Sequence, residues 1–216
     1  MSESLTGVLA LAAVTVGSLH TIAPDHWVPF AALARAQGWS RARTVRITAA
    51  CGFGHVTSSV VLGVLALFFG FEMLRLVGER MEAVAGLLLI GFGLVYAIYG
   101  LRRALGAHVH GHHHDHYDHV HEPRTMTPVA LFLLFSADPC VAVIPILFAA
   151  APLGVWQTLL VVGAYELATI ATMVALVLPA SAAARQVRGR WAGRYGDAAA
   201  GAVIASVGVL VVALGW

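Results

Sequence analysis

Six long apolar segments constrain this chain more than any other feature of its sequence. A helix needs about 20 apolar residues to cross the hydrocarbon core of a bilayer. Backbone groups in that core must be hydrogen-bonded within the segment, which makes helices the expected spanning structure. The sequence therefore predicts an all-α integral membrane protein with six transmembrane helices, over about residues 5–22, 44–71, 81–101, 128–150, 155–178 and 197–216.

The composition agrees with this fold class. The 216 residues are 59% hydrophobic and only 11% charged, whereas soluble domains carry about 25% charged residues. We expect one transmembrane domain over residues 1–216, with the lipid bilayer as a partner and no nucleic-acid partner. The oligomeric state is not predicted. The N-terminus lacks a basic stretch and carries Glu3 instead, so we expect no cleaved signal peptide.

The distribution of Arg predicts the orientation. Eleven Arg lie in the loops after the first, third and fifth segments, and two lie on the opposite side. Cytoplasmic loops carry the excess of basic residues. We therefore expect a protein of the cell (inner) membrane with both termini outside and the 102–127 loop in the cytoplasm.

Ionisable residues lie at the end of the first apolar segment. These are His20, Asp25 and His26. Charged groups inside a membrane cost a few kcal/mol each at the helix centre. Positions 20 and 25 lie about 140° apart on a straight helix, but Pro24 favours a break that could bring them together. Imidazole and carboxylate donors suit transition metals. The alternative is a polar helix end that faces the headgroups.

Further ionisable groups fall at a similar depth in three other segments. His55, Asp138 and Glu166 lie 10 or 11 residues into their segments, which is about half the hydrocarbon thickness at 1.5 Å per residue. We therefore expect them to meet inside the helix bundle. Cys140 is either a soft metal ligand or a small buried apolar residue. Glu166 either couples transport to protons or pairs with a hydroxyl group.

The two halves of the chain also resemble each other. The region around Pro24 can be aligned with Asp138 and Pro139, and His55 can be aligned with Glu166. Each half has three spans, so the second half must insert upside down. A 3+3 inverted repeat with broken helices and a site at the membrane midplane is typical of secondary transporters.

A His-rich segment separates the halves. Such a density of imidazoles predicts loose metal binding, as a buffer or sensor, and the alternative is a polar linker. The histidines are His108, His110, His112, His113, His114, His116, His119 and His121.

The motif of His20, Asp25 and His26, followed by His55 within Gly54-His55-Val56-Thr57, resembles the signature of the nickel/cobalt transporters, and most of all their shorter six-span branch. This resemblance implies metal contact by His20, Asp25, His26 and His55. Asp138, Cys140 and Glu166 form a possible site in the second half. We expect transport of Ni²⁺ or Co²⁺, with a lean towards export, no permanent cofactor and no catalytic residue or enzymatic activity.

Three other functions remain open at this level. The chain could import metal for a nickel enzyme. The Asp138-Pro139-Cys140 element is similar to a cysteine element of membrane disulfide-reductant conductors, which would make the chain a thiol–disulfide electron carrier. A haem held by His20 and His55 is the third.

Overall fold

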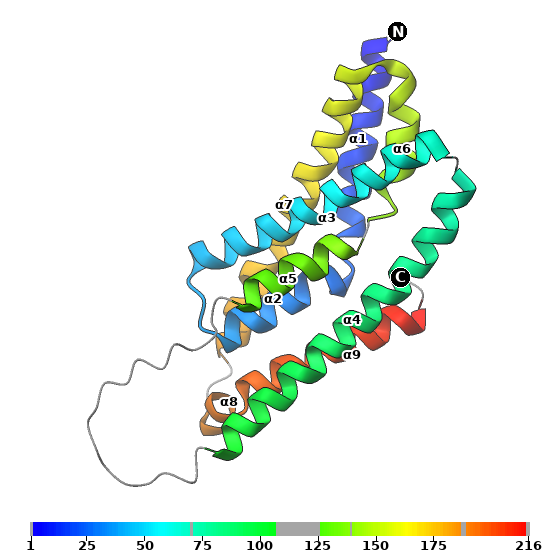
Figure 1. Cartoon of the computed structure of the whole chain (residues 1–216). Helices are drawn as coiled ribbons and strands as arrows, with labels where there is room; N and C mark the ends of the chain where they lie inside the picture. The colour runs from blue at the N-terminus through cyan, green and yellow to red at the C-terminus, as the bar shows by residue number, and fades with distance from the viewer. Residues whose placement is uncertain (1, 70, 107–125, 139, 187–188, 215–216) are drawn as a thin grey trace.

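The protein is described by a computed structural model over residues 2–69, 71–106, 126–138, 140–186 and 189–214 (Figure 1). Within these ranges it contains helices and turns and no strand, which confirms the all-α fold class. The His-rich residues 108–121 and Pro139 lie outside the described residues. The helices are α1 (Ser2–His20), α2 (Pro24–Ala36), α3 (Arg41–Phe69), α4 (Phe71–Gly106), α5 (Met126–Ala137), α6 (Val143–Ala150), the 3-10 turn η1 (Ala151–Leu153), α7 (Val155–Gln186), α8 (Arg190–Arg194) and α9 (Gly196–Leu214).

Five of the described helices are long and apolar enough to cross a membrane, over Glu3–His20, Arg41–Phe69, Val84–Gly106, Val155–Gln186 and Gly196–Leu214. Many of their large apolar side chains point away from the protein: Leu11 is 68%, Phe68 79% and Val95 69% exposed. Such surfaces are unfavourable in water and match hydrocarbon.

The fourth expected span differs from the sequence-based prediction. Residues 128–150 do not form one helix, because α5 ends at Ala137 and α6 begins at Val143. Pro139 disfavours helical geometry at Asp138, and helices of 12 and 8 residues are each too short to cross a bilayer. Six spans therefore remain a prediction in which α5 and α6 together make one broken crossing.

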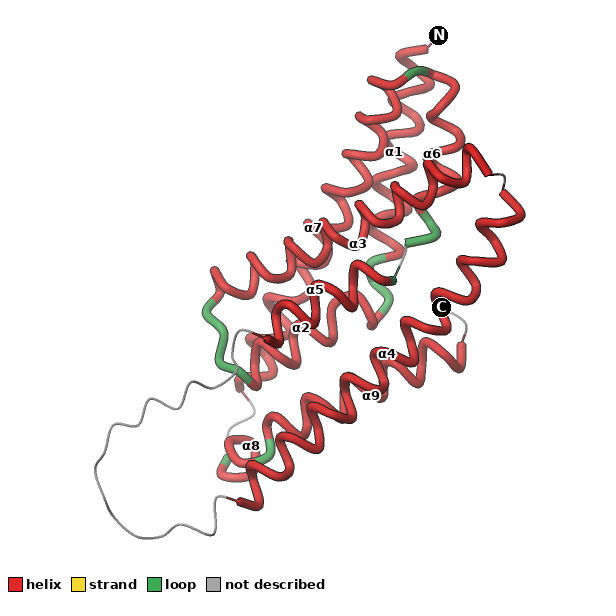
Figure 2. The backbone as a smooth tube through the Cα atoms, viewed as in Figure 1, coloured by secondary structure: helices red, strands yellow, loops and turns green. Residues whose placement is uncertain are grey.

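The first span is broken where Pro24 predicted a break. Helix α1 ends at His20, and α2 begins at Pro24 after a short turn (Figure 2). Proline is favoured at the first helical position, because the missing N–H would have no helical partner there. Both halves of the chain thus contain an interrupted helix, although the inverted repeat itself stays a prediction. Helix α4 continues to Gly106, so the first residues of the expected 102–127 loop are helical.

Helix α9 lies side by side with the later part of α4, from about Gly86 to Gly100 (Figure 1). Their backbones approach closely at Gly93, where a Cβ atom would lie 2.3 Å from the backbone N of Ala205. Small residues permit such contacts between membrane helices. This pair packs on the rest of the protein through α9 against α2 and through α4 against α3 and α5.

The other helices surround α3 and α7. Helix α7 packs against α1, α2, α3 and α6, and α3 packs against α5 and α6. The breaks after α1 and α5 are therefore both held against these two long helices. The polar residues at both breaks meet there.

Candidate functional site

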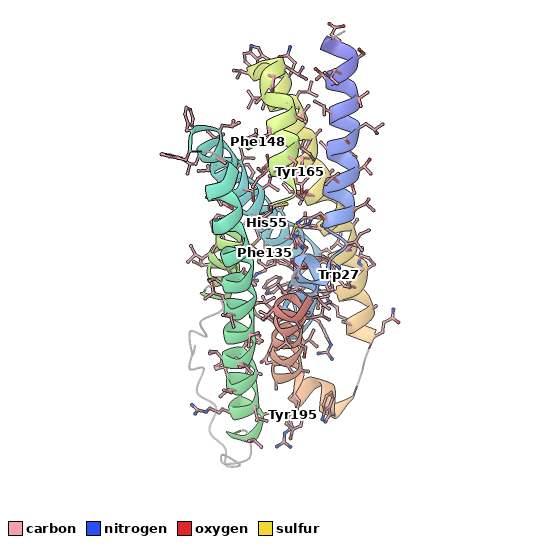
Figure 3. All side chains as sticks on the ribbon, turned by 90° about the vertical axis from the view of Figure 1, so that its right-hand side faces the viewer. Trp27, His55, Phe135, Phe148, Tyr165 and Tyr195 are labelled. Atoms are coloured by element: carbon pink, nitrogen blue, oxygen red, sulfur yellow. The ribbon has the colours of Figure 1, made fainter. Side chains whose placement is uncertain are left out.

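His55 is fixed at the contact between α3 and α5. A Cβ atom on the preceding Gly54 would lie 2.3 Å from Ser136 Oγ and 2.8 Å from the Phe132 ring, so a larger residue there would displace these side chains of α5. His55 is 1% exposed, and its Nδ1–H donates to the Phe135 carbonyl oxygen at 3.2 Å. That carbonyl lies in the last turn of α5, where it has no partner within the helix. Figure 3 shows His55 near Phe135, in the interior of the protein.

His20 and His26 approach His55 from the break in the first span. His26 is 3% exposed, and its Nε2 lies 3.3 Å from His55 Nε2. The His20 ring centroid lies 4.5 Å from that of His26 and 6.4 Å from that of His55. The turn between α1 and α2 brings His20 and His26 together, although a straight helix would separate such positions.

Cys140 joins this group from the break in the second half. It is 1% exposed, and its backbone N–H donates to Ser59 Oγ, while the Ser59 hydroxyl donates to the His55 carbonyl at 2.7 Å. Its Sγ forms a hydrogen bond of 2.8 Å with the Tyr165 hydroxyl group. One ligand atom from each of His20, His55 and Cys140 lies within 4.8 Å of the other two.

Two carboxylates lie beside the group. Asp25 Oδ2 is 3.1 Å from His26 Nδ1, and Asp25 Oδ1 is buried without a hydrogen-bond partner among the described residues. Asp25 and Asp138 line one small cavity of about 20 Å³ together with apolar residues of α4, α5 and α9. A cavity of this size has room for about one water molecule.

The structure thus gathers His20, His26, His55 and Cys140 and places Asp25 behind His26. Glu166 is not part of the group. Tyr165 is fully buried and bonds to Cys140, whereas the next residue on a helix points about 100° away. Glu166 is partly exposed, and its Oε1 has no hydrogen-bond partner in the described part of the chain. The sequence analysis expected Glu166 to meet the other ionisable residues because it lies at a similar depth. Its direction around α7 prevents this.

Two residues that bond to Cys140 were missed by the sequence analysis. Tyr165 had no signal in the sequence, because an aromatic residue in a membrane helix is usually a packing residue. Ser59 is four residues after His55, on the same helix face. This spacing was available, but serine in a membrane helix more often joins helices than contributes to a site.

Apolar helices long enough to cross a bilayer, with a group of imidazole and thiol side chains inside the helix bundle, define an integral multi-pass membrane protein with a buried polar site. Residues 6–211 match the family of cytochrome c biogenesis protein transmembrane regions. Because the match covers nearly the whole chain, the protein belongs to this family. No curated protein and no solved structure matches the chain.

The family corrects the resemblance to the nickel/cobalt transporters, which was wrong. That resemblance rested on a few polar residues in two spans, and polar residues at a broken membrane helix that is buried in protein are not specific to one family. The family match extends over all the apolar segments. Nickel or cobalt transport receives no support from it. The thiol–disulfide alternative agrees with it better.

Proposed function

We propose that the protein is a membrane thiol–disulfide carrier that serves cytochrome c biogenesis, with Cys140 as the reacting thiol. The observation that carries the proposal is the family match over residues 6–211. The site supports it, because Cys140 lies at a helix break among polar groups instead of facing lipid. The protein relays electrons between two other proteins in this proposal.

Cys140 is assigned the reaction because of where the two cysteines lie. Both are free and buried. Cys51 packs among Phe30, Leu131 and Met173 in one core cluster, whereas Cys140 packs among Val56, Val143 and Tyr165 in the other. A thiol in wholly apolar surroundings is inert, and a reactive one needs polar neighbours. The imidazoles and the Tyr165 hydroxyl provide them for Cys140 alone.

The reaction then proceeds by exchange with two partner proteins. The Cys140 thiolate attacks the disulfide of an acceptor protein, which forms a mixed disulfide and releases one acceptor thiolate. A thiolate of a dithiol donor protein attacks the Cys140 sulfur and releases the second acceptor thiolate. The other donor thiolate then frees Cys140 and leaves the donor as a disulfide. Two electrons move from donor to acceptor, and Cys140 is regenerated.

Cys140 is 1% exposed, so this exchange requires the helices around the break between α5 and α6 to open. Movement of two halves around a central site, with broken helices on both sides, is a known way to expose such a site alternately. Export, import and ATP-driven transport have no part in this proposal.

The test is restoration of covalent haem attachment to c-type cytochromes in cells that lack their own membrane thiol carrier. We expect the wild type and Cys51→Ser to restore it and Cys140→Ser to fail at equal membrane abundance. A mixed disulfide between Cys140 and an exported dithiol protein that lacks its second cysteine should also accumulate. Full restoration by the variant without either cysteine would overturn the proposal.

A further inference from the structure

The hydrogen bonds of His55 fix which of its ring nitrogens is free. Its Nδ1 lies 3.2 Å from the Phe135 carbonyl oxygen, which can only accept a hydrogen bond. The proton of the neutral ring therefore resides on Nδ1, and Nε2 carries a lone pair. A backbone carbonyl in this position is a common partner of a metal-binding histidine.

His26 is held differently. Its Nδ1 lies 3.1 Å from Asp25 Oδ2, which is an ion-pair distance without the geometry of a hydrogen bond. The His26 and His55 Nε2 atoms are 3.3 Å apart in the protein interior. Because His55 Nε2 carries a lone pair, this contact is held in one of two ways. Either a proton on His26 Nε2 makes an N–H···N hydrogen bond, or both nitrogens bind one metal ion.

The distances fit a metal ion. Ligand atoms around a tetrahedral Zn²⁺ with bonds of about 2.0–2.1 Å to nitrogen are separated by roughly 3.3–3.4 Å. The separation of the two Nε2 atoms agrees with this value. Ligand atoms of His20, His55 and Cys140 lie within 4.8 Å of one another, so an ion would draw them inwards by about 1 Å.

The remaining donor also has no other role in the structure. His20 Nε2 is buried and has no hydrogen-bond partner among the described residues. A buried ring nitrogen without a partner costs about 1–3 kcal/mol, which coordination of an ion would recover. The Asp25 carboxylate behind His26 supplies negative charge that offsets the charge of a bound cation.

We propose that His20, His55 and Cys140, with His26 as the fourth ligand, bind one thiophilic d¹⁰ ion, Zn²⁺ or Cu⁺, within the membrane. Three imidazoles and one thiolate are the donors that these ions prefer. The site differs from the set of His20, Asp25, His26 and His55 expected from the sequence, because Cys140 is a ligand and Asp25 lies beside His26 outside the ligand set. It does not depend on the proposed electron relay, although a bound ion would occupy the same thiol.

The experiment uses the full chain with two background changes. The eight His in residues 108–121 are replaced by Ala to remove binding by the loop, and Cys51→Ser leaves Cys140 as the only cysteine. The protein is stripped with a chelator in lipid nanodiscs. It is then titrated with Zn²⁺, or with Cu⁺ under anaerobic conditions against a chromophoric competitor. Ni²⁺ and Co²⁺ complete the panel.

We expect one Zn²⁺ or Cu⁺ per chain and protection of Cys140 from maleimide when the ion is bound. The relative affinities for Zn²⁺ and Cu⁺ identify which of the two the site prefers. His20→Ala, His55→Ala and Cys140→Ser should each weaken binding by at least about 100-fold. Glu166→Gln is the matched control, because Glu166 lies next to Tyr165 on α7 but is not among the proposed ligands. This variant should bind the ion as tightly as the parent protein.

X-ray absorption of the loaded parent provides a second measurement that needs no variant. It should show one sulfur neighbour at about 2.3 Å and nitrogen neighbours at about 2.0–2.1 Å in the zinc form. A parent that binds no ion stoichiometrically, or a loaded site without sulfur, would overturn the inference. His55→Ala that loses the ion but still forms the mixed disulfide separates this site from the electron relay. If the parent binds the ion but neither forms the mixed disulfide nor restores haem attachment, the proposed electron relay is refuted and the ion site is not.

Discussion

The contact between α4 and α9 gives the sharpest structural prediction, because two glycines of α4 meet opposite surroundings. A Cβ atom on Gly93 would lie 2.3 Å from the Ala205 backbone N, while nothing lies within 4 Å of one on Gly91. Both residues are inside α4 and adopt helical geometry. Gly93→Ala and Gly91→Ala therefore add the same methyl group to the same helix with different consequences.

The magnitude follows from the geometry. An ordinary contact begins at 3.4 Å, so α9 must retreat by about 1.1 Å to accept Gly93→Ala. The atom is backbone and cannot rotate away. A gap of 0.5–1 Å already forfeits a quarter to a half of a dispersion contact, and overpacking costs about 1–3 kcal/mol. Gly91→Ala has no such cost and gains up to about 1 kcal/mol from reduced backbone freedom.

The assay is thermal unfolding of the two variants and the wild type in the same detergent. Unfolding is monitored through the loss of packing between the helices. At roughly 2–4 °C per kcal/mol for a chain of this size, Gly93→Ala should melt at least about 3 °C below Gly91→Ala. Equal melting temperatures would show that α4 and α9 are not in backbone contact. The pairing described here would then be incorrect.

Three further predictions concern hydrogen bonds, ion pairs and topology. Ser59→Ala removes a buried hydroxyl group that bridges α3 to the second break, so it should cost about 1–3 kcal/mol in thermal unfolding; the neighbouring Ser58→Ala is the control and should stay within about 0.5 kcal/mol. Asp197→Asn breaks an ion pair with Arg103, whose side chain is 57% exposed, and keeps a side-chain oxygen that can accept from the Tyr96 hydroxyl, so it should cost less than about 1 kcal/mol; a larger loss would mean that the ion pair is shielded from solvent or that the Tyr96 hydrogen bond is lost too. Reporter domains fused to either terminus should be active only outside the cytoplasm, and activity inside would contradict the orientation predicted from the Arg loops.

The helix interruptions could be predicted in part from proline. Pro24 predicted the break after His20, and the structure has it. Pro139 could have predicted the break after Ala137 by the same argument, because the residue before proline avoids helical geometry. The sequence analysis instead predicted one helix over residues 128–150, because this apolar run is long enough to cross a bilayer. Two short helices have the same apolar composition.

The members of the buried group could be predicted less well. Polar residues in apolar segments identified His20, Asp25, His26 and His55, and Cys140 was one candidate among several. Their depth was calculable from the sequence, but their direction around each helix was not. Glu166 shares the depth of the group and points elsewhere, while Tyr165 beside it reaches Cys140.

The sequence alone determined that this chain crosses a membrane with helices, because hydrocarbon admits little else for apolar segments of this length. It also determined which polar groups would need partners inside the bilayer, since an unpaired polar group is costly there. Only the tertiary structure decided that Cys140 would join His20 and His55 and that Asp25 would stand behind His26. Those contacts depend on how the two broken helices rotate against α3 and α7, and rotation is set by packing between segments distant in sequence.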